Sequence, residues 1–160
     1  MAVFYLMVGL PASGKSTYAT KLLRQGQAAI VCPDTIRAMN REMEDAEVFG
    51  LAYNQVRTLL SVDKDVIFDA TNTIANFRQP LIRLAHEFGA KVVAVWLDTP
   101  LHTCLQRHVL RQQNGIKPML TREVIFRMDR QLKKTPPTTG EGFDQVVRII
   151  PDQEAALTVA

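Results

Sequence analysis

The amino-acid sequence predicts an α/β fold, in which a central, mostly parallel five-stranded sheet lies between layers of helices. Apolar runs recur along the 160 residues and alternate with helical patterns, as they do where right-handed helical crossovers join parallel strands. The first run, residues 3–8, is continuously apolar, which is typical of a strand buried on both faces. A glycine-rich loop and then a helical segment follow it directly. Together these observations predict a three-layer fold built on a strand–loop–helix unit.

The first half of the chain contributes three of the expected strands. Pro33 closes the second strand, and the third is the short run Val66-Ile67-Phe68. The helix before the third strand repeats apolar residues at helical spacing, from Phe49 to Leu60. In chain order we expect a strand at 3–8, a helix at 16–24, a strand at 28–32, helices at 34–41 and 46–61, and a strand at 65–69.

The second half contributes two more strands and three helices. Gly89 and the pair Asn114-Gly115 are typical helix stops, and Thr121 is a typical N-cap. In chain order we expect a helix at 75–88, a strand at 92–97, helices at 101–113 and 121–133, a proline-rich linker at 135–140 and a strand at 145–150.

Length and composition are those of one globular domain spanning residues 1–160. The N-terminal apolar run lacks the basic residues that begin a signal peptide, and no apolar stretch approaches the ~20 residues of a membrane-spanning helix. Cys32 and Cys104 are interpreted as free thiols in a reducing compartment. We therefore expect a cytoplasmic protein with no membrane partner. A net charge of +3 permits an acidic partner without requiring one.

Residues 9–17 read Gly-Leu-Pro-Ala-Ser-Gly-Lys-Ser-Thr, which is a complete phosphate-binding loop. Its glycines let the backbone turn sharply and approach phosphates closely, and its N–H groups and the following helix favour an anion. Lys15 is expected to reach the β- and γ-phosphates, and the Ser16 hydroxyl to bind Mg²⁺. The sequence therefore predicts binding of a nucleoside triphosphate with Mg²⁺. We expect this nucleotide to be ATP, although nothing in the loop distinguishes ATP from GTP. The expected ATP-binding residues of the loop are Gly9, Pro11, Ala12, Ser13, Gly14, Lys15, Ser16 and Thr17.

In a parallel sheet the active residues gather at the carboxyl ends of the strands. Asp34 and Arg37 follow the second strand, three residues apart on a helix. Asp34 could accept the proton of an attacking hydroxyl while Arg37 holds an anionic substrate. The alternative is that Asp34 is a helix N-cap and Arg37 is unrelated to it.

Asp69 ends the third strand, where a carboxylate could hold Mg²⁺ directly or through water. The alternative is a carboxylate that caps the next turn. Thr71 and Asn72 follow at once, and they either line an acceptor pocket or make the turn that their side chains favour.

Positive charge gathers late in the chain. Arg107 and Arg111 are four residues apart and share one helix face. We predict a lid around residues 107–122 that folds these arginines over ATP and stabilises the transition state. The alternative is a solvated basic face. The basic residues of this region are Arg107, Arg111, Lys117, Arg122, Arg127, Arg130, Lys133 and Lys134.

The order of these motifs resembles the kinase domain of polynucleotide 5′-hydroxyl kinases, within the P-loop NTPase superfamily, over nearly the whole chain. The resemblance rests on the phosphate loop, on Asp34-Thr-Ile-Arg37, on Asp69-Ala-Thr-Asn72 and on the arginine-bearing helix. It implies a P-loop NTPase fold with a helical lid. By position it implies that Asp34 is the general base and that Arg37 contacts a phosphate of the acceptor. It also implies that Asp69 serves the metal or acceptor site and that Arg78 is a substrate-side arginine. Arg111 is implied to be a lid arginine next to Arg107.

The expected function is transfer of the γ-phosphate of ATP to a hydroxyl, with the 5′-hydroxyl of a nucleic acid as acceptor. One alternative is a kinase of the same class that acts on a small metabolite or a nucleotide-sugar. Another, from a different class, is an ATP-binding switch with only slow hydrolysis. The sequence leaves the oligomeric state open.

Overall fold

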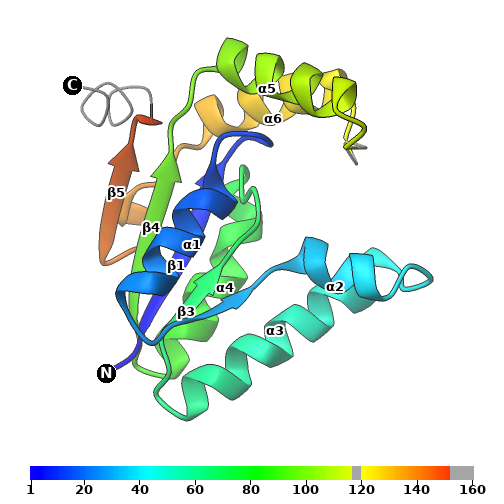
Figure 1. The fold of residues 1–160 in the computed structure, drawn as a ribbon. Coiled ribbons are helices and arrows are strands. Elements are labelled where there is room, and N and C mark those ends of the chain that lie inside the picture. The colour runs from blue at the N-terminus through cyan, green and yellow to red at the C-terminus, as the bar shows by residue number, and fades with distance from the viewer. Residues whose placement is uncertain (117–119, 152–160) are drawn as a thin grey trace.

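The sheet is five-stranded, and every pair of neighbouring strands is parallel. The computed structural model describes residues 1–116 and 120–151. The strands are β1 (Val3–Gly9), β2 (Ala29–Val31), β3 (Val66–Phe68), β4 (Lys91–Leu97) and β5 (Gln145–Ile149). They pair in the order β2-β3-β1-β4-β5, so β1 is central (Figure 1). The predicted α/β fold with a parallel five-stranded sheet is confirmed.

Helices cover both faces of this sheet and its carboxyl end (Figure 1). The helices are α1 (Lys15–Gln25), α2 (Pro33–Met39), α3 (Asp45–Ser61), α4 (Ala75–Glu87), α5 (Leu101–Gln113) and α6 (Arg122–Lys134). Their ends lie within two residues of the predicted ones. A single turn of 3-10 helix, Thr139–Glu141, overlaps the end of the predicted linker.

The continuous apolar run of β1 is explained by burial on both faces. Phe4 and Leu6 join the core cluster that α3 and α4 complete. Met7 joins the opposite cluster, where α1 packs against the sheet through Ala19. Because neighbouring strand residues point to opposite faces, a central strand with helices on both sides has no polar position.

The helices α5 and α6 lie side by side over the carboxyl ends of the strands (Figure 1). Thr121 is the N-cap of α6 as predicted, and its hydroxyl accepts from the Val124 N–H at 3.4 Å. Residues 117–119 of the predicted lid, Lys117 among them, lie outside the described residues. Within residues 1–116 and 120–151, no helix has the length and apolar character needed to cross a bilayer.

Candidate active site

The loop between β1 and α1 has the backbone that a phosphate requires. A Cβ on Gly9 would lie 2.8 Å from Ser13 Oγ and 3.0 Å from the Leu97 carbonyl oxygen, so only glycine fits there. Gly14 has φ of 99° and Ala12 has φ of 63°, both in the left-handed region. The loop is thus held in a conformation that most side chains would disfavour.

Contacts within this loop and from neighbouring segments fix its conformation. The Ser13 N–H donates to the Leu10 carbonyl at 3.1 Å, and the Thr99 hydroxyl donates to the Ser13 carbonyl at 2.7 Å. Arg107 of α5 donates from Nη1 to the Ala12 carbonyl at 3.2 Å. Arg107 therefore contacts the backbone of the phosphate loop, while the predicted lid and the predicted role of Arg107 over ATP stay predictions.

Lys15 is the buried cation of the site. Its Nζ donates to the Leu10 carbonyl at 2.7 Å, and the residue is 9% exposed. Burial lowers the pKa of Lys15 to about 8, because desolvation disfavours the charged form more than the nearby Asp69 carboxylate favours it. At neutral pH the site therefore holds a poorly solvated positive charge, which suits an incoming triphosphate.

This shifted pKa predicts that ATP affinity falls as the pH rises through about 8. Above that pH the free protein holds Lys15 neutral, and phosphate binding must first restore its proton. We expect the logarithm of the association constant for a fluorescent ATP analogue to fall with a slope approaching −1 between pH 8 and 9.5. The Lys15→Arg variant, which keeps its charge, should show no such fall. If the ATP affinity of the wild type did not change between pH 7 and 9, this result would contradict the shifted pKa.

Ser16 and Asp69 place two oxygen atoms beside Lys15. The Ser16 hydroxyl donates to Asp69 Oδ2 at 2.8 Å, and Asp69 is 7% exposed. The Asp69 N–H donates to the Val31 carbonyl at 2.9 Å, which fixes the end of β3 beside β2. One carboxylate and one hydroxyl are hard oxygen ligands of the kind that hold Mg²⁺ together with phosphates, so these residues fit the predicted ion.

Asp34 and Arg37 form an ion pair on α2. Arg37 Nη1 lies 2.5 Å from Asp34 Oδ1, and the opposite edge of the guanidinium contacts Asp45, the first residue of α3. The N-cap of α2 is Cys32, and Pro33 takes the first helical position, where proline is favoured. Asp34 is therefore not the helix cap that the alternative interpretation assumed.

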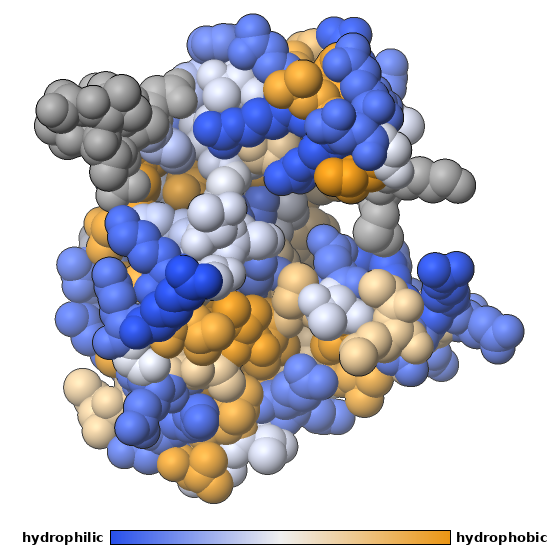
Figure 2. Space-filling view, in the orientation of Figure 1, coloured by the Kyte–Doolittle hydropathy of each residue, from blue (hydrophilic) through white to orange (hydrophobic). Residues whose placement is uncertain are grey.

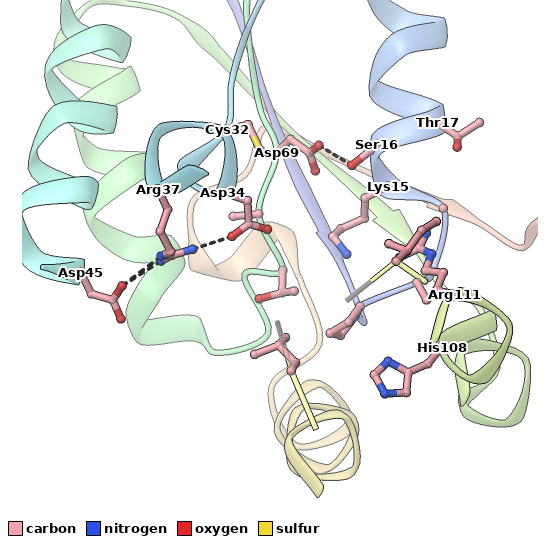
Figure 3. Close-up of a pocket in the computed structure, with 17 residues that line it drawn as sticks. Lys15, Ser16, Thr17, Cys32, Asp34, Arg37, Asp45, Asp69, His108 and Arg111 are labelled. Carbon is pink, nitrogen blue, oxygen red and sulfur yellow. Dashed lines mark hydrogen bonds and ion pairs between the residues drawn. The ribbon is translucent and has the colours of Figure 1, made fainter. Parts of the chain in front are cut away.

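One cavity of about 560 Å³ joins these groups. Figure 2 shows the surface hollowed between α5 on one side and α2 and α3 on the other. In Figure 3, Asp34 and Arg37 lie at one end, Lys15 lies in the middle, and Arg111 and His108 lie at the α5 end. The predicted residues that line it are Pro11, Ala12, Gly14, Lys15, Ser16, Thr17, Asp34, Arg37, Asp69, Thr71 and Arg111.

Arg78 does not reach this cavity. It is fully buried, and its guanidinium donates to Glu141 at 2.6 and 3.1 Å, to the Asn72 carbonyl at 2.9 Å and to the Thr135 carbonyl at 2.7 Å. Because all three of its guanidinium nitrogens donate to groups inside the protein, Arg78 is not free to bind a substrate. The interpretation of Arg78 as a substrate-side arginine is therefore replaced by a structural role.

Of the two roles left open for Thr71 and Asn72, Thr71 lines the cavity and Asn72 makes the turn. Thr71 lines the cavity, and its carbonyl accepts from the Gly9 N–H at 3.0 Å. Asn72 is buried in a left-handed turn with φ of 48°, and its amide donates to the Met7 carbonyl at 2.8 Å. Asn72 thus makes the turn that joins the Asp69 loop to β1.

Two further side chains line the cavity, and no sequence motif predicted either of them. Asp45 reaches it from α3, and His108 reaches it from α5. His108 is 3% exposed, and its Nε2 has no hydrogen-bond partner within the described part of the chain. The one available signal was spacing, because His108 and Arg111 are three residues apart and share a helix face.

Comparison with known proteins assigns this fold and loop to a family. The family described as AAA domain matches residues 4–135, which is more than half of the chain. A search of curated proteins found no match. A chain of the Pnkp1/Rnl/Hen1 RNA repair complex is 25% identical, with a TM-score of 0.76, over 89% of this chain. The match spans 46% of that longer chain, or about half of its length.

Two further solved structures have the same fold at lower identity. The APS kinase CysC of Mycobacterium tuberculosis, solved with AMPPNP and APS, is 22% identical with a TM-score of 0.62, and the match covers 99% of this chain and 95% of that one. Kti12 of Chaetomium thermophilum, solved with ADP-AlF3, is 17% identical with a TM-score of 0.74, covering 98% and 93%. The predicted P-loop NTPase-type fold is therefore confirmed.

Proposed function

Since the chain belongs to the AAA domain family and has the fold of a P-loop kinase, we propose that it is an ATP- and Mg²⁺-dependent kinase whose acceptor is the 5′-hydroxyl of a nucleic acid. One observation carries the proposal: the Asp34–Arg37 pair faces the phosphate loop across a single cavity. The Asp34 carboxylate lines the same cavity as Lys15, which would bind the γ-phosphate.

In the proposed reaction the acceptor's hydroxyl oxygen attacks the γ-phosphorus, its proton passes to the Asp34 carboxylate, and ADP leaves. Lys15 and the amides of the phosphate loop hold the phosphates, and Arg111 neutralises charge that develops in the transition state. Mg²⁺ would be held by Ser16 and Asp69 and would neutralise negative charge on the phosphates. Most of the acceleration then comes from positioning and electrostatics.

Two features support a nucleic-acid acceptor over a small one. The first is the 25% identity to a chain of an RNA repair complex. The second is the run of basic residues on α5 and α6, which would attract a phosphate backbone. We also infer that residues 1–160 form one domain, that the protein is cytoplasmic, and that Arg107 steadies the loop beside the bound nucleotide.

The test is transfer of labelled γ-phosphate from ATP, with Mg²⁺, to oligonucleotides that carry a 5′-hydroxyl, with 5′-phosphorylated oligonucleotides as the matched control. We expect label in the 5′-hydroxyl substrate alone, and a KM for it that rises steeply with salt. Label in a small hydroxyl compound but in no oligonucleotide would identify a metabolite kinase. Slow phosphate release with no labelled acceptor would identify a switch.

A further inference from the structure

Arg37 is held by two carboxylates that use different edges of its guanidinium. Nη1 contacts Asp34 Oδ1 at 2.5 Å. Nε and Nη2 both contact Oδ1 of Asp45, each at 3.1 Å. The Nε–Nη2 edge carries two parallel N–H groups, and this is the arrangement that recognises a phosphate through two oxygens. Asp45 offers this edge only one oxygen, so the fit is incomplete.

The two carboxylates also differ in what holds them. Asp34 lies on α2 with Arg37, three residues away, so the helix keeps the pair together. Asp45 comes from the next helix, its side chain is 78% exposed, and it lines the cavity. Asp45 can therefore turn into solvent while the Asp34–Arg37 contact stays in place. Arg37 itself is only 25% exposed and lines the cavity, so an anion bound in the cavity can reach it.

From this geometry we infer that Asp45 occupies the position of the acceptor's phosphate on Arg37 and is displaced when the acceptor binds. The inference rests on the proposed function, in which Arg37 contacts that phosphate. A phosphate supplies two oxygens to the Nε–Nη2 edge and more negative charge than a carboxylate, so it displaces Asp45 where a neutral group does not. Asp45 therefore weakens the binding of acceptors that carry a phosphate next to the reacting nucleoside, and it leaves the binding of acceptors without that phosphate unchanged.

The test compares Asp45→Asn with Glu47→Gln. Both residues lie in the first turn of α3 and both changes remove one negative charge, but Glu47 is not among the ion-pair partners of Arg37 in the described structure. The acceptors are a nucleoside 3′-phosphate and the corresponding nucleoside, each with a free 5′-hydroxyl. For the phosphorylated acceptor we expect Asp45→Asn to lower KM about 2–5-fold, the range of an exposed ion pair, with kcat unchanged.

For the plain nucleoside we expect no change in KM, and Glu47→Gln should resemble the wild type with both acceptors. A rise in KM for the phosphorylated acceptor would overturn the inference, because Asp45 would then be orienting Arg37 rather than competing for it. An equal fall in KM with Glu47→Gln, or no change in Asp45→Asn, would also overturn it. If the wild type phosphorylates neither acceptor nor any oligonucleotide, the proposed function fails, and the inference fails with it.

Discussion

Replacing Asp34 with asparagine is expected to reduce phosphoryl transfer about 10²–10⁴-fold, the usual contribution of a general base, without weakening ATP binding. Asparagine has the size of aspartate but cannot accept the acceptor's proton. The residues that hold the triphosphate, Lys15 and the loop amides, come from other elements of the fold, so the nucleotide site should stay intact. Single-turnover transfer of labelled phosphate, with ATP affinity measured in parallel, separates the two effects.

The matched control is Arg37→Met, which removes the other half of the ion pair. It should raise the KM for the acceptor more than it lowers kcat, because Arg37 binds substrate while Asp34 takes the proton. If the rate of phosphoryl transfer by Asp34→Asn were within a few fold of the wild-type rate, Asp34 would not be the general base. If Asp34→Asn still hydrolyses ATP, and neither the wild type nor the variant labels an acceptor, the result supports the alternative of an ATP-binding switch.

The helices and strands of this fold are predictable because each has a local pattern in the sequence. Helical spacing in α3 and continuous apolar runs in β1 and β4 arise from their burial, and helix stops such as Gly89 have φ of 71° that the backbone needs. The order of the strands has no comparable local signal. It depends on which faces the crossovers bring together, so the central place of β1 emerges only from the structure.

The candidate site divides in the same way. The phosphate loop is a contiguous motif, and its conformation follows from residues within it. The role of Asp34 is harder to predict from sequence than the phosphate loop, because an aspartate at the expected start of a helix could simply be its N-cap. The structure begins α2 at Pro33, one residue earlier than predicted, and the N-cap is Cys32. Asp45 gave no signal at all, since an acidic residue in the first turn of a helix is favoured by the helix dipole alone.

Arg78 is the residue for which sequence and structure disagree most. Its carboxylate partner Glu141 is 63 positions away, and no local pattern could join them. The pair bridges α4 to the turn at Thr139–Glu141, and Arg78 Nη1 also holds the Asn72 carbonyl. This places one buried ion pair behind the Asp69 loop, where it fixes the turn that presents Asp69 to Ser16.

The expected result of Arg78→Met is a loss of about 3–5 kcal/mol in the free energy of unfolding, because one partner of a buried pair is removed. Glu141, with its side chain 10% exposed, would keep a charge with no cation beside it, and the carbonyls of Asn72 and Thr135 would each lose a donor. Denaturant unfolding monitored by circular dichroism measures the change.

Two further variants make the interpretation specific. Arg83→Met, at an exposed position of the same helix, should change stability by no more than about 0.5 kcal/mol. The double variant Arg78→Met with Glu141→Leu should recover part of the loss, since removing both charges leaves neither one buried alone. If Arg78 were a substrate ligand, Arg78→Met would instead leave stability unchanged and raise the KM for the acceptor. The unfolding curve therefore decides between a structural arginine and a catalytic-site arginine independently of the acceptor's identity.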